Sequence, residues 1–213
     1  MRFGLLCSAQ ASDDELGPEA GQGFRDYLDF NAEAEALGYH SSFSVEHHFT
    51  GWNQVSATLT LLTCLAMRTT TLRLGTAVMV LPWHNPVLLA EQAATLDLIS
   101  GGRLDFGIGK GYRHNEFKGF GIPPEEAEAR FEEAVEVILR SWTSRTRFSH
   151  YGRYWQFQDV VVEPPTAQPA SAVLGRGSER VVDPPRRRPR IQSHSRSIRR
   201  ARCHRRAHRA LPR

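Results

Sequence analysis

The chain has 213 residues, enough for one domain with a sizeable apolar core. Its net charge of +4 combines two different parts. Residues 170–213 carry 14 arginines against Glu179 and Asp183, a net charge of +12, so residues 1–169 carry a net charge of −8. The composition therefore excludes a uniformly basic protein: the body is mildly acidic, and the basic balance belongs to the tail.

The cysteines and the start of the chain indicate the compartment. Cys7, Cys64 and Cys203 show neither paired spacing nor a metal-ligand pattern, which argues against a disulfide framework and for a reducing environment. The apolar run at Phe3–Cys7 is too short for a signal-peptide core or a membrane span. We therefore predict a cytoplasmic protein with no membrane partner and no metal.

The body alternates strand-type and helix-type segments. Apolar or β-branched runs predict strands, the last of them weak, at Phe3–Cys7, Ser42–Val45, Leu72–Leu81, Leu104–Ile108 and Val160–Val162. Between the runs, apolar residues recur with helical spacing. Gly38 is predicted to end the first helix and Ser56 to cap the second. Asn85-Pro86 is expected to begin the third helix, and Pro123-Pro124 the longest.

Regular alternation of this kind, with central strands apolar on both faces, predicts a parallel α/β sheet. Periodicity does not separate an open doubly wound sheet from a closed (β/α)8 barrel. No Gly-x-Gly-x-x-Gly turn follows the first strand, which disfavours a dinucleotide-binding sheet. The glycine-rich segment Gly107–Gly111 follows the fourth strand, but it matches neither that fingerprint nor a Walker loop.

Three ionisable side chains, Glu46, His47 and His48, directly follow the second predicted strand. Such groups cost stability at a buried strand end unless they are used. In parallel sheets and barrels, active sites are built at the carboxyl ends of the strands. We therefore expect a functional site at this point of the chain.

Several motifs carry a resemblance to a known family. They stand in order and at compatible spacing at Glu46–Thr50, Leu74–Pro82, Gly102–Gly111, Glu116-Phe117 and Phe120-Gly121. Through them, residues 1–168 resemble the bacterial luciferase-like flavin-dependent monooxygenases. The resemblance implies a TIM-type (β/α)8 barrel, incomplete here with about five β/α units.

The same resemblance implies a chemistry. It predicts binding of reduced FMN, supplied by a separate flavin reductase, and use of O2 to oxygenate an aldehyde or another small organic substrate. A flavin- or F420-dependent oxidoreductase on the same barrel, which transfers hydride, is the alternative. The intact family member is expected to be a homo- or heterodimer.

His47 matches the position of the family's catalytic histidine. An imidazole suits that position because it gains and loses protons near neutral pH, where flavin–oxygen chemistry needs an acid or a base. Glu46 is expected on the cofactor side, where Glu46 and His48 can tune His47 through hydrogen bonds. The alternative for either histidine is a satisfied buried group.

Four more residues are implied beside the flavin. Ala77-Val78 falls where the family often has a non-prolyl cis peptide under the flavin ring. Gly109 stands where luciferase has a reactive cysteine, so no thiol chemistry is carried over to this chain. Lys110 is expected to contact the flavin phosphate, with a solvated lysine as the alternative.

The substrate side is less well marked. His48, Arg113 and Glu116 are candidate contacts, although polar loop residues are often only solvated. Trp52 and Trp83 are expected to pack in the core rather than to touch a ligand.

The resemblance ends at residue 168, which divides the chain into a partial barrel domain (1–168) and a tail (169–213). The tail is rich in Arg and Pro and has no Phe, Trp, Tyr or Met, so we predict disorder. We also expect it to be out of frame. Codons that encode Ala170–Gly177 can, when they are read one base later, encode Pro-Ala-Pro-Phe-Trp-Val-Ala-Ala. This shifted sequence resembles the family's apolar fifth strand.

A barrel with strands missing leaves unpaired strand edges, so the chain as given is expected to bind FMN weakly or not at all. An alternative use for the tail is a nucleic-acid-binding arm, in which clustered arginines contact phosphates. The lack of aromatic residues for base stacking disfavours that alternative.

Overall fold

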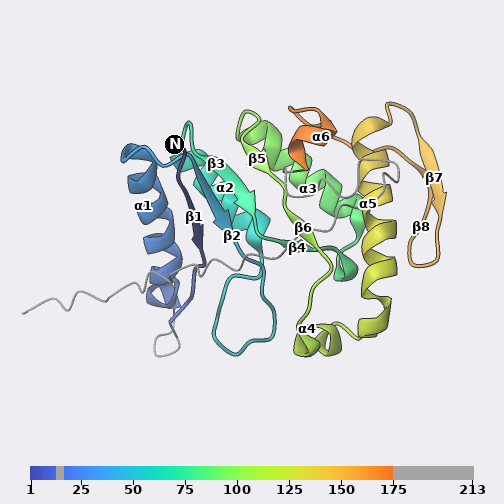
Figure 1. Ribbon diagram of the computed structural model, residues 1–213, viewed down its shortest axis with the longest axis horizontal. Helices are drawn as coiled ribbons and strands as arrows, with labels where there is room; N and C mark the ends of the chain where they lie inside the picture. The colour runs from blue at the N-terminus through green and yellow to red at the C-terminus, as the bar shows by residue number, and fades with distance from the viewer. Residues whose placement is uncertain (13–16, 175–213) are drawn as a thin grey trace, which may run out of the picture. The chain divides into compact units, whose positions relative to one another are not determined.

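Four strands form the main parallel sheet of the computed structural model, which describes residues 1–12 and 17–174 (Figure 1). In spatial order they are β1 (Gly4–Cys7), β2 (Ser41–Ser44), β3 (Arg73–Thr76) and β5 (Leu104–Asp105). A parallel pair, β4 (Met79–Val80) with β6 (Ile108–Gly109), continues the chain beyond β3 and β5. The parallel α/β fold predicted from the sequence is confirmed.

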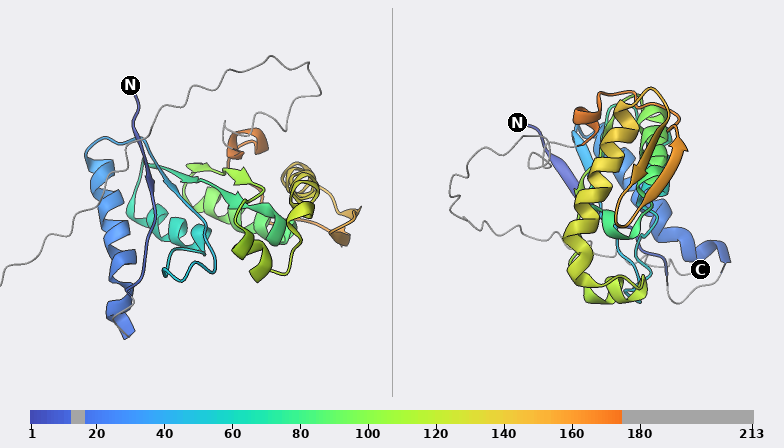
Figure 2. Two further views of the ribbon diagram at one scale, coloured as in Figure 1. Left: turned by 60° about the horizontal axis from the view of Figure 1, so that its bottom comes forward. Right: turned by 90° about the vertical axis from the view of Figure 1, so that its right-hand side faces the viewer.

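Helices alternate with these strands and pack beside one another (Figure 2). The long helices are α1 (Gln22–Ala36), α2 (Thr58–Arg68), α3 (Pro86–Ile99) and α5 (Ala127–Thr143). The short ones are α4 (His114–Gly119), α6 (Ala170–Val173), η1 (Gly17–Gly21), η2 (Leu81–Trp83) and η3 (Pro124–Glu126). Helix α2 contacts α1 and α3, and α3 contacts α5, as in one arc of a β/α barrel.

Local signals set most helix boundaries. The side chain of Asn85 accepts hydrogen bonds from two backbone N–H groups in the first turn of α3, so the predicted cap is confirmed. Gly38, with a φ of 87°, follows the end of α1 as predicted. The predicted cap at Ser56 was wrong, because α2 begins at Thr58 without a side-chain cap. The Thr58 hydroxyl instead donates to the carbonyl of Val45.

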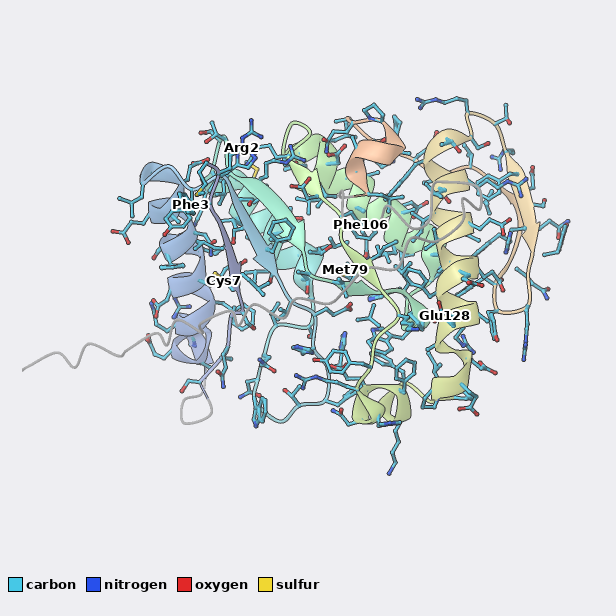
Figure 3. All side chains as sticks on the ribbon, viewed as in Figure 1. Arg2, Phe3, Cys7, Met79, Phe106 and Glu128 are labelled. Atoms are coloured by element: carbon cyan, nitrogen blue, oxygen red, sulfur yellow. The ribbon has the colours of Figure 1, made fainter. Side chains whose placement is uncertain are left out.

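The core lies between the sheet and the helices. Leu74 and Leu104 are register partners, and both are completely buried. Phe106, just beyond β5, is also completely buried (Figure 3). Leu6 and Phe43 are register partners on the opposite face, and there Leu6 is 66% exposed. The face that a closed barrel would bury is therefore open within the part of the chain that the structure describes.

The fifth parallel strand predicted at Val160–Val162 was wrong. Val160 ends β8 (Gln156–Val160), which pairs antiparallel with β7 (Phe148–Tyr151) in a hairpin. Glu133 of α5 fixes this hairpin by accepting hydrogen bonds from three consecutive backbone N–H groups, residues 153–155. The described residues therefore contain four parallel strand positions in the main sheet, one fewer than expected.

After the hairpin the chain returns to β5. The buried carboxylate of Asp97 accepts hydrogen bonds from the backbone N–H of Gln168 (2.9 Å) and from its Nε2 (2.7 Å). Further on, the carbonyl of Val173 accepts a hydrogen bond from the N–H of Phe106 at 2.7 Å. Val173 thus lies at the outer edge of β5, where the next barrel strand would begin. From residue 175 onward, the predicted disordered tail lies outside the described residues.

Two kinds of feature are missing from residues 1–12 and 17–174. None of their helices has the length and apolar character needed to cross a bilayer. Their His, Cys, Asp and Glu side chains also form no group of three or more arranged to hold a metal ion.

Arg103 connects the loops around the sheet through hydrogen bonds. Its guanidinium donates five hydrogen bonds of 2.7–3.0 Å to groups at the ends of α2 and α3 and before β3. We expect Arg103→Ala to lower the free energy of unfolding by about 2–4 kcal/mol in urea denaturation, because several acceptors lose a charged donor. Arg68→Ala, which removes an exposed ion pair with Asp29, should cost less than about 1 kcal/mol. Equal effects of the two changes would contradict this role.

Candidate active site

The carboxyl ends of the central strands bring the predicted site residues together. The N–H of Ala77 donates to the carbonyl of Ser44 at 2.8 Å, so the chain beyond β3 lies beside the end of β2. Val80 is the register partner of Gly109 across β4 and β6. Residues 46–48 follow β2 and therefore lie next to the segment that contains Ala77 and Val80.

Glu116 lies behind the two adjacent histidines. Although it comes from α4, its carboxylate is only 2% exposed. Its Oε1 lies 3.1 Å from Nδ1 of His47 and accepts a hydrogen bond from the backbone N–H of His48 at 2.9 Å. The N–H of His47 donates to the carbonyl of Val55, which fixes the backbone at this point. Glu116, predicted on the substrate side, is thus a buried partner of His47.

Glu46 is the second buried carboxylate, at 2% exposure. Its Oε1 lies 3.0 Å from Nε2 of His48 and 2.6 Å from Nε2 of His84, while Oε2 accepts the N–H of Val80 at 2.6 Å. Burial raises the pKa of Glu46, but the hydrogen bonds from these partners and the charge of His84 outweigh burial, so the pKa falls below its ordinary value. Glu46 therefore ties β2, β4 and η2 together as a carboxylate.

This network predicts a pH dependence of stability. Because the folded-state pKa of Glu46 is depressed below 4.5, the ionised carboxylate stabilises the fold above that pH, and the contribution is lost as the pH falls through the folded pKa. Glu46→Gln should therefore flatten the fall in unfolding free energy as the pH drops below 4.5. Urea denaturation at several pH values measures it. Glu33→Gln, at an exposed position on α1, is the control and should leave the pH profile unchanged.

Three residues predicted beside the flavin, Ala77, Val78 and Gly109, lie together and expose an apolar side chain, that of Val78. The peptide bond between Ala77 and Val78 is cis, as the sequence resemblance implied. The side chain of Val78 is 36% exposed, and a Cβ added to Gly109 would lie 2.6 Å from its Cγ2. The missing side chain at Gly109 therefore leaves room beside Val78. An exposed apolar side chain next to a glycine suits contact with a planar ring system such as a flavin.

Lys110 directly follows Gly109 and is engaged elsewhere. Its ammonium group forms an ion pair with Glu128, which lies in the first turn of α5. The two side chains flank a surface depression of about 200 Å³ beside α4 and α5. His47, Val78 and Gly109 do not line that depression, so we place the candidate active site at the strand ends instead.

Aromatic rings surround His48. Its ring centroid lies 4.9 Å from that of Phe120 and 6.0 Å from that of Trp83, and Trp83 stacks on Phe120. Trp83 is half-buried in this cluster and does not belong to the buried core, so the predicted core packing is not confirmed for it. That prediction was wrong for Trp52, which is 58% exposed. Arg113 precedes α4, and its guanidinium lies 5.7 Å from the Tyr112 ring.

A comparison with known families identifies the fold. The family model described as luciferase-like monooxygenase matches residues 1–184. The chain belongs to this family. Its flavin- and F420-dependent members are oxidoreductases, as the names of the relatives below indicate.

Three relatives of the luciferase-like chain are informative. The oxygenase component of flavin-dependent trigonelline monooxygenase from Acinetobacter baylyi is 30% identical over 172 residues, covering 79% of this chain and 47% of the relative. F420-dependent glucose-6-phosphate dehydrogenase from Amycolatopsis mediterranei is 30% identical over 181 residues, 81% of this chain and 52% of that protein. The crystal structure of monooxygenase RslO1 from Streptomyces bottropensis superposes with a TM-score of 0.72 at 34% identity, covering 79% of this chain and 50% of that one. The chain thus spans about half the length of these relatives.

Within the luciferase-like fold, the structure brings together most of the predicted site. Glu46, His47 and His48 stand beside the segment that contains Ala77 and Val78. Two partnerships were missed from the sequence: that of Glu116 with His47, and that of His84 with Glu46. The position of His84 directly after the third predicted strand was the available signal, because the ends of neighbouring parallel strands meet.

Proposed function

We propose that the chain carries the flavin-facing part of an FMN-dependent monooxygenase that uses reduced flavin and O2 to oxygenate an aldehyde or another small organic substrate. The observation that carries this proposal is the pairing of His47 with the buried carboxylate of Glu116, at the strand ends where the apolar side chain of Val78 is accessible. An imidazole that is fixed by a buried carboxylate suits proton transfer to or from a bound ring.

Each of the site residues would have a separate role. Ala77, Val78 and Gly109 would hold the ring of FMN, which when bound supplies the electrons for oxygen chemistry. His47 would hold or accept a proton at Nε2, the ring nitrogen that makes no hydrogen bond among the described residues. Glu46 would act indirectly, since it binds the N–H of Val80 and two imidazoles.

A separate flavin reductase is the proposed partner. The relative from Acinetobacter baylyi is named as an oxygenase component, which supports a two-component arrangement for this chain. The described residues offer Lys110 for a flavin phosphate, but that ammonium is paired with Glu128. The phosphate site would therefore depend on residues beyond those that the structure describes.

A hydride-transferring, F420-dependent oxidoreductase is the second candidate. The similarity to F420-dependent glucose-6-phosphate dehydrogenase, over 81% of this chain, favours it specifically. The two candidates are distinguished with a version of the chain in which the codons after residue 168 are read one base later. Formation of a carboxylic acid from a long-chain aldehyde with reductase, FMN and air supports the monooxygenase. Substrate-dependent reduction of F420 without oxygen supports the alternative, and failure of both contradicts the proposal.

The nucleic-acid alternative for the tail falls on residues outside the described part of the chain. It predicts binding to a random-sequence DNA duplex with an affinity that falls steeply with salt. A filter-binding titration of the chain as given at two salt concentrations tests it. Binding that is absent at the lower salt concentration would rule out the basic-arm function.

A further inference from the structure

The two adjacent histidines of the site occupy different hydrogen-bonding environments. His47 uses Nδ1 toward Glu116, whereas His48 uses Nε2 toward Glu46. Their side chains are similarly accessible, at 16% and 17%, so exposure does not distinguish them. The difference lies in which ring nitrogen faces a carboxylate.

Glu116 is held in a fixed position. Its Oε1 accepts the backbone N–H of His48, a group that can only donate. The next residue, Phe117, is 2% exposed and packs edge-on against Trp83, which anchors α4 over the site. A buried carboxylate that is fixed in this way cannot move when the imidazole changes its tautomer. The imidazole must therefore present an N–H to the carboxylate.

His48 and His84 share the other carboxylate. Both use Nε2 toward the same Oε1 of Glu46, and that carboxylate also accepts the N–H of Val80. An ionised carboxylate only accepts hydrogen bonds, so each of these rings carries its proton on Nε2. The ring of His48 is further enclosed by Phe120 and Trp83. His48 therefore has only Nδ1 left as an acceptor, on a ring that the two aromatic side chains flank.

We infer that Glu116 is a positioning residue that keeps neutral His47 in the Nδ1–H tautomer and leaves its Nε2 as the proton acceptor of the site. Glu46 holds His48 and His84 in the opposite, Nε2–H tautomer and assigns them a structural role. The inference rests on the proposed function only for the use of that proton acceptor. The tautomers themselves follow from the geometry of the two carboxylates, and they hold for oxygenation and for hydride transfer alike.

Nitrogen-15 NMR of the histidine-labelled chain tests this directly, without flavin or substrate. At about pH 8.5, roughly two units above the ordinary histidine pKa, each neutral ring reports which nitrogen carries the proton. The spectra of His47→Gln, His48→Gln and His84→Gln assign the three signals. We expect His47 as Nδ1–H, and His48 and His84 as Nε2–H. A wild-type His47 found as Nε2–H, or still doubly protonated at that pH, overturns the inference.

Two variants test the role of the carboxylate. Glu116→Ala should shift His47 from the Nδ1–H to the Nε2–H form, because no acceptor remains for Nδ1. Glu116→Gln should retain the Nδ1–H form, since an amide oxygen still accepts from that nitrogen. Glu133→Ala removes the carboxylate partner of another histidine, His150, and is the matched control. It should leave His47 unchanged. If Glu116→Ala leaves the His47 tautomer unchanged, the positioning role is wrong.

The test separates this inference from the proposed function. If the tautomers are as expected but no oxygenation is detected, the proposed activity is wrong while the role of Glu116 stands. If oxygenation is detected and His47 is found as Nε2–H, the reverse is true.

Discussion

Reading the codons after residue 168 one base later is expected to raise the affinity for FMN by at least about 100-fold over the chain as given. The reason is that two or more charge-assisted hydrogen bonds to the phosphate become available, each contributing about 1.5–3 kcal/mol. In β/α barrels the phosphate site is often built from the loops after the last strands. The residues proposed to contact the ring lie in the described part of the chain, but Lys110, the residue predicted for the phosphate, is paired with Glu128.

The open face of the sheet is a second reason to expect a difference in FMN affinity between the two versions. Leu6 is 66% exposed on the face that a closed barrel would bury, and β1 pairs only with β2 among the described residues. An apolar strand edge of this kind promotes association between chains rather than ligand binding. Completing the barrel would cover this edge and enclose the flavin side of the site.

The structure indicates where the shifted sequence would enter. Asp97 holds Gln168, and the carbonyl of Val173 bonds to the N–H of Phe106 at the edge of β5. In the shifted frame, Phe would stand at the place of Val173 and Trp at that of Leu174. Both of these positions are already buried, at 0% and 3% exposure, so they suit apolar residues. We therefore propose that the parent sequence continues in the second frame.

Fluorescence quenching of FMN and of riboflavin by the two proteins measures the effect. Riboflavin lacks the phosphate, so its affinity should rise less than that of FMN. The prediction would be contradicted if the chain as given, soluble and without a fusion partner, bound FMN as tightly as the frame-shifted version. Resequencing the gene across codon 168 tests the frame itself, and an intact frame that encodes the arginine run would end that proposal.

The sequence predicted those features that depend on local chemistry. Asn85 followed by Pro86 specifies a helix start whatever surrounds it, and Gly38 specifies a helix end. The alternation of strand and helix patterns was sufficient for a parallel sheet. It did not reveal that Val160 belongs to an antiparallel hairpin, because an apolar run does not encode which strand it pairs with.

The candidate site was predictable only as far as its residues are consecutive. Glu46, His47 and His48 are conspicuous because three ionisable groups follow one apolar run. The partner of His47 lies 69 residues away, and a glutamate in a polar loop gives no sign that it will be buried. Only the packing of α4 through Phe117 brings Glu116 behind the histidines. The cis peptide at Ala77-Val78 was predicted from family resemblance, not from the properties of those two residues.

Replacing His47 with alanine in the frame-shifted version is expected to lower turnover by about 100- to 10,000-fold, the usual contribution of a positioned acid or base. This corresponds to about 3–5 kcal/mol of lost transition-state stabilisation. The large effect is expected because we infer that Nε2 of His47, whose Nδ1 faces Glu116, is the proton acceptor of the site. No other imidazole replaces it, since those of His48 and His84 are bound to Glu46.

The matched control is His40→Ala. His40 precedes β2 at its amino end and His47 follows β2 at its carboxyl end, so the two changes remove the same group from opposite ends of one strand. His40→Ala should leave turnover within about twofold, as expected for a substitution away from the site. FMN binding measured in both variants separates chemistry from assembly: His47→Ala should retain most of the affinity while it loses turnover. Unchanged turnover in His47→Ala would remove the proton-transfer role, and an equal loss in both variants would show that the effect is structural.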